Sequence, residues 1–249
     1  MSLPTPFYDS GGITIYCGDM RQIVEELNAA AVITDPPYDS TGLEWDKWPD
    51  GWPRLISKCS NNFWCFGSLR MFWDNRADFT DWKMAQELVW EKHNGSGLHN
   101  DRFRRVHELM VQFYQGEWQK IYHSPVMVYD AQHRKIRRQG KPVHWGQLNS
   151  PGSYEVAEGG PRLMRSVIYC KSTHMAAEHP TQKPEGVIYP LVEYSVPKNG
   201  LVLDPFMGSG TTLRVAKNLG RRAIGIDLNE EFCRIAARRM EQETLFSIA

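Results

Sequence analysis

The stretch GLVLDPFMGSGTTLRVAKNLG, residues 200–220, runs from an apolar segment through a glycine-rich loop into an amphipathic segment. The apolar residues before Asp204 predict a buried strand, and Leu213, Ala216 and Leu219 recur at the spacing of one helix face. Gly220 follows them, in the position where a glycine commonly ends a helix. The stretch therefore predicts a strand, a glycine loop and a helix in direct succession.

The same alternation continues on both sides of this stretch. RAIGID, residues 222–227, predicts another strand, and residues 228–240 predict a helix that is capped by Asn229, with acids in its first turn and arginines in its last. Strands that alternate with helices are typical of a doubly wound, mostly parallel α/β sheet. Toward the N-terminus the pattern predicts strands at 13–19, 30–35, 61–68 and 108–116 and helices at 20–28 and 51–59.

The composition favours one large α/β domain with an insertion over two small domains, because 249 residues with 41% hydrophobic content suffice for a sizeable core. The five cysteines are scattered without a CxxC pair, so they predict neither a disulfide framework nor a metal cluster. No run approaches the ~20 apolar residues that span a bilayer. We expect a soluble, cytoplasmic protein with no bound metal and no membrane partner.

Four predicted strands end in an acid: Asp19, Asp35, Asp204 and Asp227. Ligands of doubly wound sheets bind at the carboxyl ends of the strands, where these four side chains would meet. A single acid in such a place is usually a turn or cap residue. Four of them together predict a binding site at this edge of the sheet.

The glycine loop indicates which ligand this edge binds. Gly208 and Gly210 lack the Cβ atoms that would keep a ligand away from the backbone. The loop is not a phosphate-binding P-loop, because no Lys follows Gly210, and Leu213 replaces the third small residue of a dinucleotide fingerprint. Asp227 stands where an acid would accept hydrogen bonds from a ribose diol. Together these residues predict an adenosine-containing cofactor without a phosphate requirement.

Three short motifs make a family resemblance specific: DPPY at 35–38, HPTQKP at 179–184 and DPFMGSGTT at 204–212. With these motifs the chain resembles the β class of DNA amino-methyltransferases, in which the order of the motifs is circularly permuted. The resemblance implies a Rossmann-like fold that binds S-adenosylmethionine and releases S-adenosylhomocysteine. It implies a site-specific transfer of a methyl group to the exocyclic N6 of adenine, or N4 of cytosine, in double-stranded DNA after base flipping.

The chemistry of DPPY agrees with this resemblance. An amine conjugated to its ring is a poor nucleophile, and Asp35 together with the carbonyl of Pro36 would accept its two N–H bonds during transfer. Pro36 and Pro37 lack backbone N–H groups and hold the loop rigid, and Tyr38 offers an aromatic face to a base that has left the duplex stack. We therefore expect Asp35, Pro36, Pro37 and Tyr38 to form the catalytic site.

The choice of base follows from Asp35. The cytosine enzymes of the family often carry Ser in that place, so Asp favours adenine N6 and leaves N4 of cytosine as the alternative. RNA is a weaker alternative substrate. A non-catalytic DNA-binding protein that retains the fold is the alternative from a different class.

The resemblance also assigns cofactor contacts. Asp227 would hold the ribose, Gly18 and Asp19 would lie against the adenine, and Thr181 and Lys183 would reach the methionine part. For His179, cofactor contact and a loop-ordering hydrogen bond are equally consistent with the sequence. The full predicted cofactor set is Gly18, Asp19, Asp35, Thr181, Lys183, Asp204, Pro205, Phe206, Gly208, Ser209, Gly210, Thr211 and Asp227.

The middle of the chain concentrates positive charge. Residues 102–141 contain nine Lys and Arg against three Asp and Glu, although the whole chain is neutral. An isolated basic run is usually a solvated surface, but between two halves of a methyltransferase it predicts phosphate contacts and a target-recognition region. We predict a catalytic domain at 1–115 and 165–249 and an inserted target-recognition region at 116–164, with a homodimer or a separate restriction endonuclease as possible partners. The predicted DNA-binding residues are Arg102, Arg104, Arg105, Arg134, Lys135, Arg137, Arg138 and Lys141.

Overall fold

The computed structural model describes residues 3–38, 46–96, 101–136, 154–172 and 182–242. The chain divides into two compact units. The first comprises Met1–Ser124 and Ser166–Ala249, and the second, here called the insert unit, comprises Pro125–Arg165. Residues 116–124, which the sequence placed in the insertion, belong to the first unit, where the backbone N–H of Ser124 donates to the carbonyl of Tyr194 at 2.8 Å.

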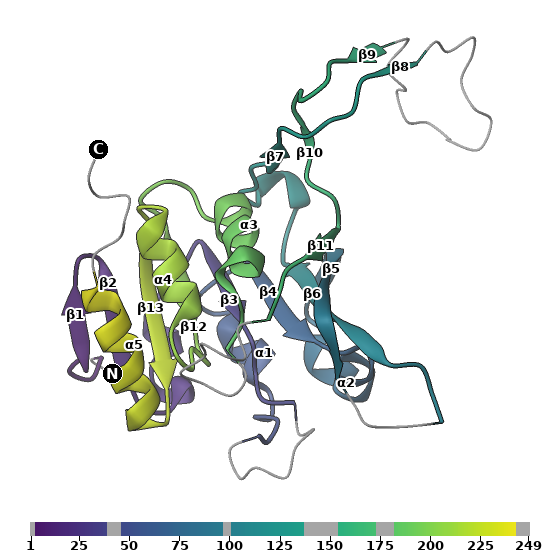
Figure 1. Cartoon of the computed structure of the whole chain (residues 1–249). Coiled ribbons are helices and arrows are strands. Elements are labelled where there is room, and N and C mark those ends of the chain that lie inside the picture. Colours follow the sequence, from purple (N-terminus) through teal and green to yellow (C-terminus); the bar gives the residue numbers. More distant parts are fainter. Residues whose placement is uncertain (1–2, 39–45, 97–100, 137–153, 173–181, 243–249) are drawn as a thin grey trace. The chain divides into compact units, whose positions relative to one another are not determined.

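One nine-stranded sheet organises the first unit, in the order β1-β2-β13-β12-β3-β4-β6-β5-β11 (Figure 1). The five strands from β2 to β4 are mutually parallel, β6 is antiparallel to both its neighbours, and β11 is parallel to β5. The strands are β1 Tyr8–Ser10, β2 Ile13–Cys17, β3 Ala31–Thr34, β4 Asn62–Gly67, β5 Lys83–Ser96, β6 Arg105–Tyr114, β11 Val167–Tyr169, β12 Leu201–Asp204 and β13 Arg222–Asp227.

The strand order reverses between β3 and β12, which lie side by side with Leu203 opposite Val32. From β3 the chain continues to β4 on one side, and from β12 it continues to β13 on the other side. Because the connections after these two strands run to opposite sides, a crevice forms between the carboxyl ends of the strands. Asp35 follows β3 and Asp204 ends β12, and both therefore lie at this crevice.

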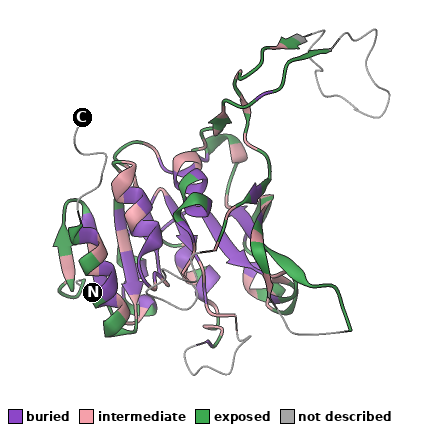
Figure 2. Ribbon diagram, viewed as in Figure 1, coloured by how far each residue is buried: buried purple, intermediate pink, exposed green. Residues whose placement is uncertain are grey.

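Two layers of helices and loops cover the sheet. The helix α3 (Glu185–Ser195) packs against α4 (Thr211–Asn218), and α4 packs against α5 (Glu230–Glu241); together they contact strands β2, β3, β12 and β13. On the opposite face, Trp52 of α1 (Trp52–Ile56) is fully buried against Phe63, with ring centroids 6.0 Å apart. Burial is concentrated in the central strands (Figure 2).

Several elements differ from the pattern-based expectation. Residues 20–28 form two short 3₁₀ turns, Met20–Gln22 and Val24–Glu26, where a helix was predicted. The apolar spacing there buries Ile23 and Val24 in the core, and the two turns achieve this without the continuous hydrogen bonds of a helix. The strand β5, the helix α2 (Leu69–Asp74) and α3 were not predicted; α3 contains Pro190, which argues locally against a helix.

The insert unit contains two short antiparallel pairs. The strand β7 (Met127–Val128) pairs with β10 (Arg162–Leu163), and β8 (Arg134–Ile136) pairs with β9 (Tyr154–Val156). Within the described residues of the whole chain, no helix is long and apolar enough to cross a membrane.

Candidate functional site

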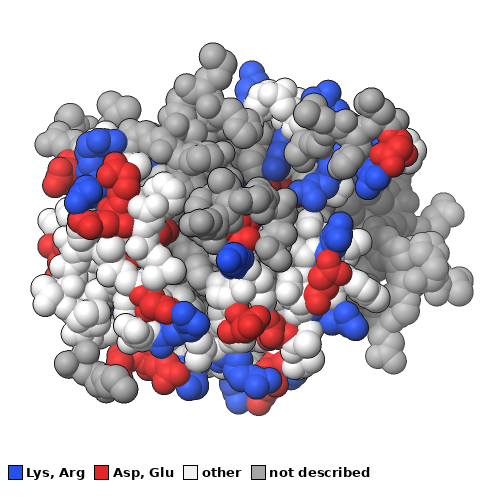
Figure 3. All heavy atoms as spheres, turned by 90° about the horizontal axis from the view of Figure 1, so that it is seen from below, with Lys and Arg blue, Asp and Glu red and all other residues white. Residues whose placement is uncertain are grey.

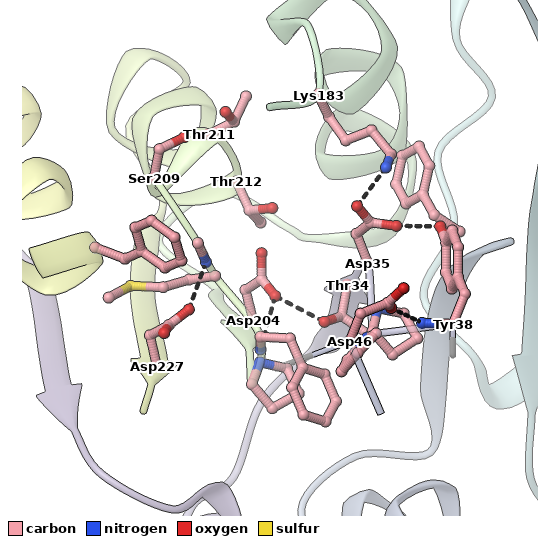
Figure 4. A pocket seen from close by; sticks show the side chains of 18 of the residues that line it. Thr34, Asp35, Tyr38, Asp46, Lys183, Asp204, Ser209, Thr211, Thr212 and Asp227 are labelled. Atoms are coloured by element: carbon pink, nitrogen blue, oxygen red, sulfur yellow. Dashed lines mark hydrogen bonds and ion pairs between the residues drawn. The ribbon is translucent and has the colours of Figure 1, made fainter. Parts of the chain in front are cut away.

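A cavity of about 620 Å³ lies along the carboxyl ends of the central strands. Loops that follow β2, β3, β12 and β13 line one part of it, and side chains of β5 and β6 line the other. This volume is within the range of small-molecule and cofactor pockets. Figure 4 shows side chains of residues that line it. The face seen from below the view of Figure 1 carries Lys and Arg interspersed with Asp and Glu (Figure 3).

Asp35 stands at the first position after β3 and projects into the cavity (Figure 4). The hydroxyl of Tyr38 donates to its Oδ1, and the ammonium of Lys183 donates to its Oδ2. The carboxylate is 23% exposed, so it remains accessible to a ligand in the cavity while both its oxygens are held. The acid of the DPPY motif is therefore held in a fixed orientation at the crevice.

Two further charged residues complete this cluster. Glu108 of β6 is 4% exposed, and its Oε1 lies 3.1 Å from Lys183 Nζ and 3.0 Å from Tyr38 Oη. Its Oε2 lies 2.6 Å from the ammonium of Lys92 on β5, which is 17% exposed. Lys92, Glu108, Lys183 and Asp35 thus form a chain of alternating charge, which we call the charge chain.

The charge chain determines the protonation of its members. Burial raises the pKa of Asp35, the Lys183 ammonium opposes this, and the Glu108 carboxylate adds to it. Burial alone would raise the pKa of Glu108, but Lys183 and Lys92 outweigh burial and lower that pKa to about 2. Burial opposes the charge of Lys183, yet the two carboxylates prevail and raise its pKa. At neutral pH Glu108 is therefore ionised and Lys183 is protonated.

Sequence patterns did not identify Glu108, Lys92 or Asp46. Glu108 shares one face of β6 with buried Met110 and Gln112, so the signal in the sequence was an acid at an inward-facing strand position. Asp46 is 4% exposed, and its Oδ1 accepts from the backbone N–H of Tyr38 at 2.7 Å. It thereby holds the DPPY loop from outside the motif.

Asp204 occupies the centre of the cavity wall. Its Oδ1 accepts from the hydroxyl of Thr34 at 2.7 Å and from the backbone N–H of Phe206 at 3.2 Å. Burial raises the pKa of Asp204 to about 7, although the hydrogen bonds from Thr212 and Thr34 lower it. This carboxyl therefore braces β3 against the glycine loop.

Asp227 supports the glycine loop from β13. Its Oδ2 accepts from the backbone N–H of Gly208 at 2.9 Å, and its Oδ1 accepts from that of Asn229 at 2.8 Å. Gly208 has φ 50°, in the left-handed region that favours glycine. A carboxylate has about four lone-pair sites, so Asp227 retains acceptor capacity for hydroxyl groups in the cavity.

The end of the cavity beside β13 suits an adenosine-containing group. Asp19 and Asp227 line it together with apolar Met207, Leu228 and Phe232. The cation beside them, Arg21, is paired with the Asp19 carboxylate, which lowers the pKa of Asp19. Carboxylates accept from ribose hydroxyls and repel phosphate, so this set of groups fits a cofactor without phosphate.

Most predicted site residues meet in this cavity. Gly210 does not line it: a Cβ there would lie 2.9 Å from the Cβ of Ala236, so the absent side chain admits α5. Lys183 lines the cavity and contacts Asp35 and Glu108, and its reach to a methionine group stays a prediction. Thr181 and His179 lie outside the described residues. The lining residues from the prediction are Gly18, Asp19, Asp35, Pro36, Pro37, Tyr38, Lys183, Asp204, Pro205, Phe206, Gly208, Ser209, Thr211 and Asp227.

The predicted DNA-binding residues are spread over both units. Arg105 lines the cavity, and Arg102 is paired with Asp101 at 2.7 Å. In the insert unit Lys135 is paired with Glu155 at 2.7 Å, so part of its positive charge is locally compensated. The others within the described residues are Arg104 and Arg134, whereas Arg137, Arg138 and Lys141 lie outside them.

Comparison with known proteins gives consistent matches. A family model described as DNA methylase matches residues 29–238. The type II methyltransferase M2.LlaDCHI of Lactococcus lactis subsp. cremoris is 25% identical, over 98% of this chain and 94% of the relative. M1.MboII of Moraxella bovis, also a type II methyltransferase, is 29% identical over 87% of this chain and 90% of the relative.

Solved structures share the fold. The complex of M1.HpyAVI with SAM superimposes with a TM-score of 0.62 at 23% identity, covering 92% of this chain and all of that one. The cytosine-N4-specific PvuII DNA methyltransferase has a TM-score of 0.65 at 14% identity, with coverage of 96% and 90%. The predicted methyltransferase fold is confirmed.

Proposed function

The chain belongs to the DNA methylase family whose model matches residues 29–238, and from this membership we propose that it methylates N6 of adenine at a specific site in double-stranded DNA. It is a DNA methyltransferase of the N6-adenine or N4-cytosine group, and its methyl donor is S-adenosylmethionine. The observation that carries the proposal is Asp35, held at the crevice beside a cavity end that suits adenosine.

The cofactor would lie at the β13 end of the cavity. Asp227 has acceptor capacity for the ribose hydroxyls, and Asp19 lies across the same space. Phe206 and Met207, which follow β12, also line the cavity. When bound there, S-adenosylmethionine supplies an electrophilic methyl group.

The chain's own residues prepare the acceptor. Asp35 accepts an N–H of the target amine, and the carbonyl of Pro36 accepts the other, which favours an available lone pair on nitrogen. Lys183 keeps Asp35 oriented, and the Tyr38 ring offers a stacking face to the extruded base. After transfer, Asp35 takes up the proton that the methylated nitrogen releases.

Adenine is favoured by Asp35, because the cytosine enzymes of the family often have Ser in that place. The PvuII enzyme, which shares the fold, is cytosine-N4-specific by its name, so N4 of cytosine is the second candidate. We further propose that the insert unit contributes to target recognition. A homodimer and a partner endonuclease remain predictions from the resemblance.

The test is transfer of a labelled methyl group from S-adenosylmethionine to unmethylated duplex DNA, followed by digestion and mass spectrometry of the nucleosides. We expect N6-methyladenine. Labelled N4-methylcytosine would retain the mechanism and overturn the choice of base. Label in RNA alone would move the substrate to the other polymer, and no transfer to either would favour a non-catalytic protein.

A further inference from the structure

The buried carboxylate of Glu108 has no place in the motifs that identify the family. Glu108 comes from β6, where it lies opposite Trp90 of the adjacent strand β5. Its partner Lys92 lies two positions beyond Trp90 on β5. Lys92 Nζ also lies 4.6 Å from the centroid of the Trp90 ring. An ionised carboxylate that is 4% exposed needs such compensation to persist inside the protein.

The hydroxyl of Tyr38 joins the two carboxyl groups. Its Oη contacts Asp35 Oδ1 and lies 3.0 Å from Glu108 Oε1. A hydroxyl carries one hydrogen, so it can donate to only one of the two oxygens at a time. The second contact becomes a hydrogen bond only when a carboxyl brings a proton of its own. A proton taken up by Asp35 would therefore let Asp35 donate to Tyr38 Oη while the Tyr38 hydroxyl donates to Glu108 Oε1.

We propose that Glu108 and Lys92 act as positioning residues, which orient Lys183 and Tyr38 on Asp35 and make Asp35 a better acceptor for the proton of the target amine. This inference rests on the proposed function. As nitrogen bonds to the methyl carbon, the methyl–sulfur electron pair leaves with S-adenosylhomocysteine. One N–H bond then breaks: its proton passes to Asp35, and its electron pair stays on nitrogen.

The fixed charge of Glu108 explains why Asp35 takes the proton. Two ammonium groups hold the pKa of Glu108 at about 2, so this carboxylate stays ionised in neutral solution. Burial raises the pKa of Asp35, and the like charge of Glu108 raises it further. Glu108 thus serves as a permanent negative neighbour, while Asp35 is the group that changes charge.

Other titratable groups also face Asp35. Cys65 approaches from β4, and burial raises the pKa of its thiol, so it is neutral. Asp204 approaches from β12, and burial raises its pKa to about 7. Both remain in place when Glu108 or Lys92 is substituted, so a difference between variants reports on the charge chain.

Two substitutions with opposite expected effects test the proposal. The measured quantity is the rate of single-turnover methyl transfer as a function of pH, whose acidic limb reports the ionisation of Asp35. Glu108→Gln removes the like charge and leaves Lys183 to Asp35 alone, so the midpoint should move to lower pH by about one unit. Lys92→Gln leaves Glu108 less compensated and draws Lys183 toward it, so the midpoint should move to higher pH.

A second measurement needs neither cofactor nor DNA. Carboxyl ¹³C chemical shifts of aspartate-labelled protein are followed with pH, and the Asp35 signal is assigned by its absence in Asp35→Asn. The same opposite shifts are expected, and the spectra show whether each variant is folded. The inference would be overturned if the titration midpoint of Asp35 were unchanged in both folded variants. It would also be overturned if the midpoint moved in the same direction in both. If the wild type transfers no methyl group, the proposed function fails, and the ¹³C titration still decides the role of Glu108.

Discussion

Replacing Lys183 with Met should destabilise the protein in a way that depends on pH. Lys183 is 11% exposed and contacts both Asp35 and Glu108, so Lys183→Met leaves the buried Glu108 and the partly buried Asp35 without their shared cation. Breaking a buried ion pair by removing one partner costs about 3–5 kcal/mol. For a chain of this size, each kcal/mol lowers the melting temperature by roughly 2–4 °C, which predicts a decrease of about 10 °C at pH 8.

The sign of the pH dependence follows from the carboxylates. The folded-state pKa of Asp35 is already above its unfolded value, and loss of Lys183 raises it further. The destabilisation is therefore full above that pKa and is relieved as Asp35 binds a proton at lower pH. In the wild type, the depressed pKa of Glu108 contributes stability that is full above its ordinary value of 4.5 and is lost as the pH falls from there to about 2.

The assay is thermal unfolding of the cofactor-free protein at pH 8 and pH 5. Lys58→Met is the matched control, because Lys58 pairs with Glu25 at 2.6 Å and is 53% exposed. Such a surface pair contributes no more than about 1 kcal/mol. The reasoning is refuted if Lys183→Met is no more destabilising than this control, or if its decrease in melting temperature is equal at both pH values.

Three further predictions concern the site, the glycine loop and DNA binding. Asp35→Asn should abolish methyl transfer and leave cofactor affinity by calorimetry within about threefold, because Asp35 contacts the acceptor end of the cavity; transfer at the wild-type rate would contradict its role. Gly210→Ala should lower the free energy of unfolding in urea by about 1–3 kcal/mol, because φ is 76° and the new Cβ would meet Ala236, whereas Gly116→Ala, which meets no atom within 4 Å, should cost less. Replacing Arg137 and Arg138 with Ala should reduce the slope of log affinity for DNA against log salt by about 2, as expected for two phosphate contacts; an unchanged slope in binding titrations would place the contacts elsewhere.

The sequence was most informative where a function depends on neighbouring residues. DPPY and the glycine loop are contiguous, so their chemistry could be inferred before any strand was paired. It was less informative where burial alone determines structure: the apolar spacing of residues 20–28 predicted a helix, but two 3₁₀ turns bury the same side chains. The helix α3 was missed because it contains Pro190, which locally disfavours a helix. In the folded protein, packing of α3 against α4 outweighs the lost backbone hydrogen bond.

The amino-acid sequence by itself determined the sheet class, the family and the acids at the strand ends, since strand periodicity and short motifs are local properties of the chain. Only the tertiary structure decided which charges meet. Lys183 reaches Asp35 across 148 residues of sequence, and Glu108 joins them because β6 and β4 are paired in one particular register. The protonation of Asp35 depends on these neighbours and on their exclusion from water, and both arise when the strands come together.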